Sequence, residues 1–240
     1  MELTTVIYAG LIFFVAYLVR GVAGFGSGLI AVPLLALLFP ITSVVPLVVL
    51  LDYIGSASQG IKNRDSIAWK DQLPLIPFIL IGVGVGLFLL QAMSTPVLRK
   101  TLGAFVITYA IYRWLPLPAL RGSRLFVIPF GFLGSFVGTL FGTGGPFYVI
   151  YLTLRDLEKR AFRATFATNF LIDGAIRLTA YATVGFFSRE VLMSFLAALP
   201  VAGAGLYLGG RIHTGFTQQT FVRFISVLLL GSGIVLLLKH

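Results

Sequence analysis

The sequence contains no cysteine and few charged residues among its 240 positions. Without cysteine, neither disulfides nor thiolate chemistry are available to this chain. Charged residues make up 11% of the sequence, whereas a soluble domain averages about 25%. The chain has 8 acidic residues against 18 lysines and arginines, which gives a formal net charge of +10. The 2 histidines have no metal-ligand neighbours in the sequence, so we expect no metal and no cofactor.

Apolar residues take the place of the missing charges. They make up 58% of the chain, and the mean hydropathy is +1.00. Successive apolar runs of about 20 residues are typical of a polytopic membrane protein. The start of the chain, Met1-Glu2-Leu3, lacks the basic segment and cleavage site of a signal peptide. Most basic residues fall in short loops, where topology explains them better than nucleic-acid binding does.

The apolar runs predict an all-α fold of membrane helices joined by polar loops. The predicted helical segments cover 3–39, 44–61, 73–93, 97–114, 125–154, 162–184, 191–210 and 220–238. The loop 115–124, which carries Pro116 and Pro118, is the best boundary in the chain. We therefore predict two related membrane repeats, 1–116 and 117–240.

Dense glycines interrupt the first and fifth segments. The two runs are Gly26-Ser27-Gly28, preceded by Phe25, and Gly142-Thr143-Gly144-Gly145-Pro146, preceded by Phe141. Each glycine costs about 1 kcal/mol relative to alanine inside a helix, so both helices should break there. The second half of a broken helix begins with unpaired N–H groups, which attract anions, and Ser27 and Thr143 add hydroxyl donors. The alternative is that the glycines serve only close helix packing; two matched runs favour binding.

A second pattern also repeats between the halves. Pro77-x4-Gly82-x3-Gly86 recurs as Pro200-x4-Gly205-x3-Gly209, 123 positions later (77 to 200). Together with the glycine runs, this spacing indicates internal duplication, which is common in transporters. We expect each repeat to hold one broken or re-entrant segment followed by three transmembrane helices.

The basic residues of the loops test the orientation of the repeats. Eight plain spans with loop 62–70 inside divide these residues 8 against 8, which shows no positive-inside bias. If segment 125–154 instead returns to the side it entered, the division becomes 12 inside against 4 outside. The four outside are then Arg99, Lys100, Arg189 and Lys239. The count favours a hairpin at 125–154, another at 3–39 by symmetry, and inverted repeats.

Four ionisable residues lie within apolar segments: Arg20, Asp52, Asp173 and Arg177. Such residues cost about 3 kcal/mol or more each and usually face a cavity or a partner. Helical spacing places polar residues in a stripe along each of two segments. The stripes are Asp52, Ser56 and Gln59, and Thr165, Thr168, Asn169, Asp173 and Arg177. The alternatives are that Asp173–Arg177 and Arg20–Asp52 are structural pairs, and that Arg20 extends to the membrane surface.

The two glycine runs and the residues around them resemble the motifs of a known family. Gly21-x-x-Gly24-Phe25-Gly26-Ser27-Gly28-x4-Pro33 and Gly138-x3-Gly142-Thr143-Gly144-Gly145-Pro146 are similar to the paired motifs of the TauE/SafE family of sulfite and organosulfonate exporters. The resemblance covers nearly the whole chain. It implies transport of small sulfur-containing anions, such as sulfite or sulfoacetate, across a prokaryotic cytoplasmic membrane. The first motif is less glycine-rich than in many members of the family.

The sequence therefore predicts a secondary transporter for a small sulfur-containing anion rather than an enzyme. The anion would bind at the two breaks, with Arg20 and Arg177 supplying charge and Asp52 and Asp173 orienting these arginines. The full predicted set is Arg20, Gly26, Ser27, Gly28, Asp52, Gln59, Gly142, Thr143, Gly144, Gly145, Asn169, Asp173 and Arg177. The alternatives are an anion channel with the same site and an intramembrane serine hydrolase using Ser27. Expected partners are membrane lipid and the anion, without nucleic acid; a homodimer stays open.

Overall fold

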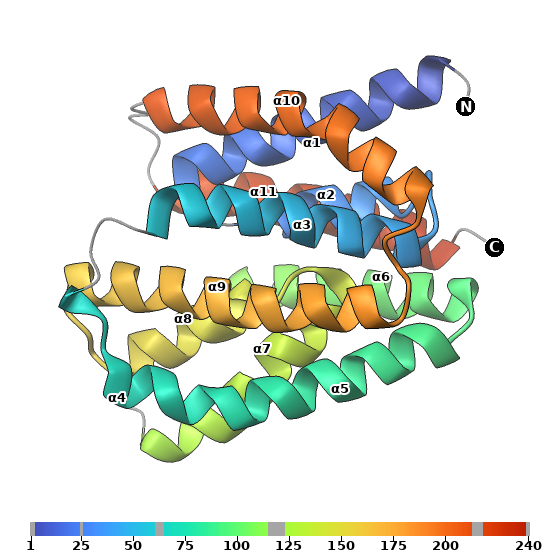
Figure 1. Ribbon diagram of the computed structural model, residues 1–240. Coiled ribbons are helices and arrows are strands. Elements are labelled where there is room, and N and C mark those ends of the chain that lie inside the picture. The colour runs from blue at the N-terminus through green and yellow to red at the C-terminus, as the bar shows by residue number, and fades with distance from the viewer. Residues whose placement is uncertain (1–2, 25, 61–64, 115–122, 213–217, 239–240) are drawn as a thin grey trace. The chain divides into compact units, whose positions relative to one another are not determined.

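The structure is a computed structural model that describes residues 3–24, 26–60, 65–114, 123–212 and 218–238, with side chains left out at 58–60 and 218–225 (Figure 1). These residues form helices and no strand, which confirms the all-α prediction. The helices are α1 Leu3–Ala23, α2 Ser27–Leu35, α3 Ile41–Gly60, α4 Trp69–Gln72, α5 Ile76–Ala92, α6 Thr95–Trp114, α7 Val127–Phe141, α8 Gly145–Leu154, α9 Lys159–Thr183, α10 Arg189–Arg211 and α11 Gln218–Leu238. Phe25 and residues 115–122, most of the predicted boundary loop, lie outside the described residues.

Several helices are suited to a bilayer. Among the described residues, four helices are long and apolar enough to cross it: Leu3–Ala23, Trp69–Ala92, Arg124–Phe141 and Arg189–Arg211. Ile41–Ala57, Gly145–Leu154 and Ser226–Leu238 are shorter apolar helices. Large apolar side chains on the spans are exposed, among them Phe88 and Leu196. An apolar exterior of this kind matches the acyl chains of lipid.

The chain forms two compact units. Unit 1 contains residues 1–48, 93–117 and 189–240, and unit 2 contains residues 49–92 and 118–188. Each unit thus takes helices from both sequence halves. The predicted repeats, 1–116 and 117–240, concern the sequence and stay a prediction.

Unit 1 is organised by the contact of α1 with α10, which lie side by side (Figure 1). Glycines make this contact close. A Cβ atom at Gly205 of α10 would lie 2.6 Å from the carbonyl oxygen of Phe14, and one at Gly21 of α1 would lie 2.8 Å from Cα of Gly209. Two backbones can approach this closely only where side chains are missing. In the same unit α6 packs against α11, and α2 contacts α1 and α11.

Unit 2 is organised by the equivalent contact of α5 with α7. A Cβ atom at Gly82 of α5 would lie 2.5 Å from the carbonyl oxygen of Phe132, and one at Gly86 would lie 2.9 Å from Cβ of Thr139. The apolar core beside this contact consists of Leu75, Ile79, Val83, Val127, Tyr148, Tyr151 and Leu152. In both units, therefore, the glycine-repeat helix of one sequence half packs against the helix that precedes a glycine run in the other half.

The described ends of the helices agree with the predicted segments to within a few residues, with two differences. The predicted loop 62–72 contains the short helix α4, and the predicted loop 155–163 ends early, because α9 begins at Lys159. Lysine, arginine and alanine favour a helix, so the basic first turn of α9 continues the helical run that follows it.

Candidate functional site

The glycine run between α7 and α8 supplies the backbone of the candidate site. Helix α7 ends at Phe141, and Gly142 is left-handed, with φ at 66°. The N–H of Gly142 donates to the carbonyl oxygen of Gly138 at 2.9 Å. This left-handed cap ends many helices, because glycine adopts it without steric cost. Helix α8 starts at Gly145, so the run separates two distinct helices.

Thr143 lies within this interruption. The residue is 3% exposed, and its Oγ1 atom is buried without a hydrogen-bond partner among the described groups. Leaving a buried hydroxyl unsatisfied costs about 1–3 kcal/mol. The hydroxyl stands just before the first turn of α8, where unpaired N–H groups and the helix dipole favour negative charge. The place is therefore suited to an anionic acceptor.

Some glycines of the run are required by packing. A Cβ atom at Gly144 would overlap the carbonyl oxygen of Gly134 on α7, and one at Gly145 would lie 3.2 Å from the ring of Phe170. Close packing therefore accounts for Gly144, whereas Gly142 is required by its backbone conformation. Packing does not account for the buried hydroxyl of Thr143.

Arg177 brings a positive charge to the same place. Its side chain is 4% exposed, Nη1 donates to the carbonyl oxygen of Gly138 at 2.9 Å, and Nη2 donates to Oδ2 of Asp173. The two charged residues are one helical turn apart on α9, which lets them pair directly. A Cβ atom at position 138 would lie 2.9 Å from Nη1, so glycine there makes room for the guanidinium.

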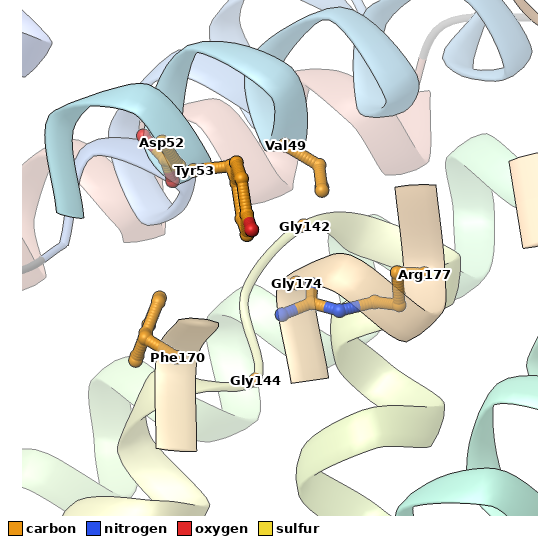
Figure 2. A pocket seen from close by; sticks show the side chains of 8 residues that line it. All are labelled: Val49, Asp52, Tyr53, Gly142, Gly144, Phe170, Gly174 and Arg177. Atoms are coloured by element: carbon orange, nitrogen blue, oxygen red, sulfur yellow. The ribbon is translucent and has the colours of Figure 1, made fainter. Parts of the chain in front are cut away.

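A pocket opens where α3, the glycine run and α9 meet within unit 2 (Figure 2). Its lining residues are Val49, Asp52 and Tyr53 from α3, Gly142 and Gly144 from the run, and Phe170, Gly174 and Arg177 from α9. The space has room for about one water molecule. A larger ligand therefore requires lining side chains, such as Tyr53 or Phe170, to move.

The polar stripe of α9 is formed as predicted from its spacing, and its inner members are buried. Thr165, Asn169 and Asp173 are each 0% exposed. Asn169 accepts a hydrogen bond from Nε2 of Gln72 at 3.0 Å and does not line the pocket. Asp52 lines the pocket, while the side chain of Gln59 lies outside the described part of the chain.

The first glycine run belongs to unit 1. Gly26 is left-handed, with φ at 100°, and α2 begins at Ser27. Nη1 of Arg20 donates to Oγ of Ser27 at 3.1 Å, and Arg20 is 3% exposed, so its side chain does not extend to the surface. Gly28 is buried within α2. The predicted pairing of Arg20 with Asp52 joins residues of the two units and stays a prediction.

Sequence reasoning missed several residues of the unit 2 pocket. Tyr53 and Phe170 form aromatic walls, and Gly174 admits the Tyr53 ring, since a Cβ atom there would lie 2.9 Å from Cδ2 of that ring. Gly138 was identified only as a motif glycine, not as the group that receives Arg177. Phe170 directly follows Asn169 in the sequence, and Gly174 directly follows Asp173. This adjacency to the polar stripe was the sequence signal that could have identified them.

The described residues hold no group of three or more histidine, aspartate or glutamate side chains placed to bind a metal ion. Both histidines, His213 and His240, lie outside those residues. The chemistry at hand in unit 2 is thus a guanidinium, a hydroxyl and the start of a helix. Such a set can bind an anion by hydrogen bonds and charge.

Helices that can cross a bilayer, together with buried arginines beside interrupted helices, define a membrane transport protein. Comparison with known families identifies which one. The family of the sulfite exporter TauE/SafE matches residues 9–236, and the chain belongs to this family. It is accordingly a multi-pass protein of the cell membrane, in a family of transporters rather than enzymes.

Two named relatives are similar over most of their length. The probable inner membrane transporter protein TsaS of Comamonas testosteroni is 28% identical over 195 residues, which cover 79% of this chain and 81% of that protein. The probable sulfite/organosulfonate exporter TauE of Cupriavidus necator is 26% identical over 227 residues, covering 90% of this chain and 88% of that protein. No solved structure matches the chain significantly.

Proposed function

We propose that the chain is a secondary transporter that moves sulfite or an organosulfonate across the cytoplasmic membrane and binds it at the glycine runs. The observation that carries the proposal is the buried, unpartnered hydroxyl of Thr143 at the interruption whose flanking glycines line a pocket with Arg177. The family, and the printed name of the Cupriavidus relative, supply the class of anion.

Binding would use the guanidinium of Arg177, which lines the pocket, and the hydroxyl of Thr143, which lies between two lining glycines but is not itself a lining residue. A sulfonate or sulfite oxygen can accept from the Thr143 hydroxyl and from Arg177, whose Nε atom is buried with no hydrogen-bond partner among the residues that the structure describes. Hydrogen bonds to charged groups contribute about 1.5–3 kcal/mol each. Asp173 accepts a hydrogen bond from the guanidinium and would give up part of this contact when the anion binds, which keeps Arg177 from standing unpaired in the membrane.

The lengths of α2 and α8 support hairpins at the two runs. These helices have 9 and 10 residues, which is about 15 Å at 1.5 Å per residue. The hydrocarbon core of a bilayer is about 30 Å thick. Neither helix can cross it, so each is suited to a re-entrant arm that ends at depth.

An ion pair in unit 2 supports the same topology. Nε of Arg155 lies 2.7 Å from Oδ1 of Asp71. Eight plain spans would put the loops before α5 and after α8 on opposite sides of the membrane, where no such contact can form. A hairpin at 125–154 places both loops on one side, as the charge count favours.

The internal packing of the units supports the repeat. Gly24 N–H donates to the Arg20 carbonyl oxygen at 2.6 Å, as Gly142 N–H donates to that of Gly138 at 2.9 Å. Both caps are left-handed glycines, 118 positions apart (24 to 142). In each unit, moreover, a helix of one sequence half packs against a helix of the other half: α1 against α10, and α5 against α7. Two inverted repeats that exchange helices with each other would produce both correspondences.

Replacing Thr143 by valine tests the proposed site. Valine keeps the shape and removes a hydroxyl that has no protein partner, so the melting temperature should stay the same or rise. Affinity for sulfite should fall about tenfold, because one hydrogen bond to the anion is lost. The matched control is Thr108→Val, which removes an exposed hydroxyl bonded to its own helix at Ala104. Unchanged sulfite affinity and flux in folded Thr143→Val would contradict the proposed site.

A further inference from the structure

Residues 68–72, which are Ala68 and the short helix α4, are joined to α9 by two hydrogen bonds. The backbone N–H of Ala68 donates to Oγ1 of Thr165 at 2.9 Å. Nε2 of Gln72 donates to Oδ1 of Asn169 at 3.0 Å. Gln72, Thr165 and Asn169 are each 0% exposed, so the contact between the segment and α9 is fully buried.

The same segment is tied to the end of α8 through Asp71. Nε of Arg155 donates to Oδ1 of Asp71 at 2.7 Å, and the hydroxyl of Tyr151 donates to the Asp71 carbonyl oxygen at 3.2 Å. The side chains of Arg155 and Asp71 are 18% and 11% exposed. The pair therefore stands at a partly wet edge, where water can compete for both charges.

The contact with α9 also leaves polar atoms unsatisfied. Within the described part of the chain, Oε1 of Gln72 and Nδ2 of Asn169 are buried without a hydrogen-bond partner. Each such atom disfavours the closed contact, because water would satisfy it once the segment moved away. The two unsatisfied atoms partly offset the polar contacts that hold the segment, so they lower the free energy needed to release it.

The position of this segment relates it to the pocket. Thr165 and Asn169 lie about three and about two helical turns, respectively, from Arg177 along one face of α9, at about 5.4 Å per turn. Residues 68–72 bind the first two, while Arg177 lines the pocket. The segment thus contacts the stretch of polar face between the pocket and the α8–α9 loop.

We propose that residues 68–72 are a latch, whose release opens the polar face of α9 and admits the anion to the pocket from the side of the α8–α9 loop. The inference rests on the proposed function, since it names the step that regulates access to the proposed site. The latch is closed in the described structure, in keeping with a pocket that has room for about one water molecule.

The accessibility of a cysteine in the pocket tests the latch. The chain has no cysteine of its own, so Phe170→Cys places a single thiol in the pocket lining. The probe is an impermeant methanethiosulfonate reagent that carries a sulfonate, applied to inside-out vesicles and to intact cells. Asp71→Ala should speed labelling at least about tenfold from one side only, because a charged hydrogen bond is lost. Glu158→Ala, an exposed carboxylate outside the latch, is the matched control and should not change the rate.

Two further variants keep the test decisive. Thr165→Val removes the acceptor of the Ala68 N–H and should also speed labelling, whereas the exchange Asp71→Arg with Arg155→Asp should restore slow labelling. The latch would be overturned if folded Asp71→Ala and Thr165→Val were labelled no faster than the Phe170→Cys parent, or if Glu158→Ala sped labelling as much as they do. Protection of the thiol by sulfite and sulfite flux are measured separately. If the latch variants speed labelling but sulfite neither protects the thiol nor crosses the membrane, the proposed function is wrong. If sulfite protects the thiol and is transported but the latch variants do not change labelling, the latch is wrong.

Discussion

Gly138→Ala is the most specific perturbation of the candidate site, because it adds one carbon beneath the Arg177 guanidinium and removes no charge. The added Cβ atom would lie 2.9 Å from Nη1 and 3.1 Å from Cζ, whereas ordinary contacts begin at 3.4 Å. The guanidinium must therefore retreat by about half an ångström. That movement disturbs the bond from Nη1 to the Gly138 carbonyl oxygen, which is 2.9 Å long.

Two magnitudes follow from this geometry. Overpacking a well-packed site destabilises a fold by about 1–3 kcal/mol, so the melting temperature should fall modestly. A displaced charged hydrogen bond is worth about 1.5–3 kcal/mol, which corresponds to a sulfite affinity at least about tenfold weaker. The assay is sulfite binding by calorimetry on purified protein, together with sulfite flux in vesicles.

The matched control is Gly84→Ala in the same unit. A Cβ atom at Gly84 would meet nothing within 4 Å, and alanine favours the helix by about 1 kcal/mol. This variant should keep both affinity and flux and match or exceed the starting stability. If Gly138→Ala folds and binds sulfite as tightly as Gly84→Ala does, the position of Arg177 is irrelevant to binding and the reasoning fails.

Two further predictions address topology and the buried ion pair. Cysteines at Ser123 and Glu158, both exposed, should resist an impermeant thiol reagent outside intact cells and react after lysis; labelling of only one from outside would contradict the hairpin at 125–154. Single removal of Asp173 or Arg177 should destabilise the protein by about 3–5 kcal/mol. The double variant Asp173→Asn/Arg177→Gln should recover its melting temperature but not its flux, whereas near-normal flux would leave the pair a purely structural role.

Local sequence signals predicted the helices and the polar face of α9. Its Thr165, Asn169, Asp173 and Arg177 are spaced by four, and periodicity alone places them on one side. The bond between Asp173 and Arg177 follows from the same spacing. Helical periodicity determines which residues share a face, so this part of the site could be found without coordinates.

Long-range packing was not predictable from such signals. That Gly144 touches α7 at Gly134, and that Gly138 receives Arg177 from another helix, depends on how helices pair. Gln72 was assigned to a loop, because a four-residue helix has too few positions to show periodicity. Its contact with Asn169 joins positions 97 apart in the chain, a distance at which one sequence carries no pairing signal.

The arginine beside each glycine run comes from a different helix in the two units. This difference helps to decide whether the runs serve packing or anion binding. Arg20 and Gly138 are equivalent, since their carbonyl oxygens accept the two glycine caps. In unit 1 the arginine is on α1 itself and donates to Ser27. In unit 2 that position is a glycine, and Arg177 reaches its carbonyl oxygen from α9.

Close packing needs small residues at the runs, but it does not need a buried guanidinium, which is costly in a membrane. A helix that only had to pack could hold an apolar residue at position 20 and leave the space above Gly138 to an apolar side chain. Each unit instead places an arginine where a helix is interrupted and N–H groups are unpaired. A requirement for positive charge at both interruptions would explain this arrangement, and it is the requirement that the proposed anion site would impose.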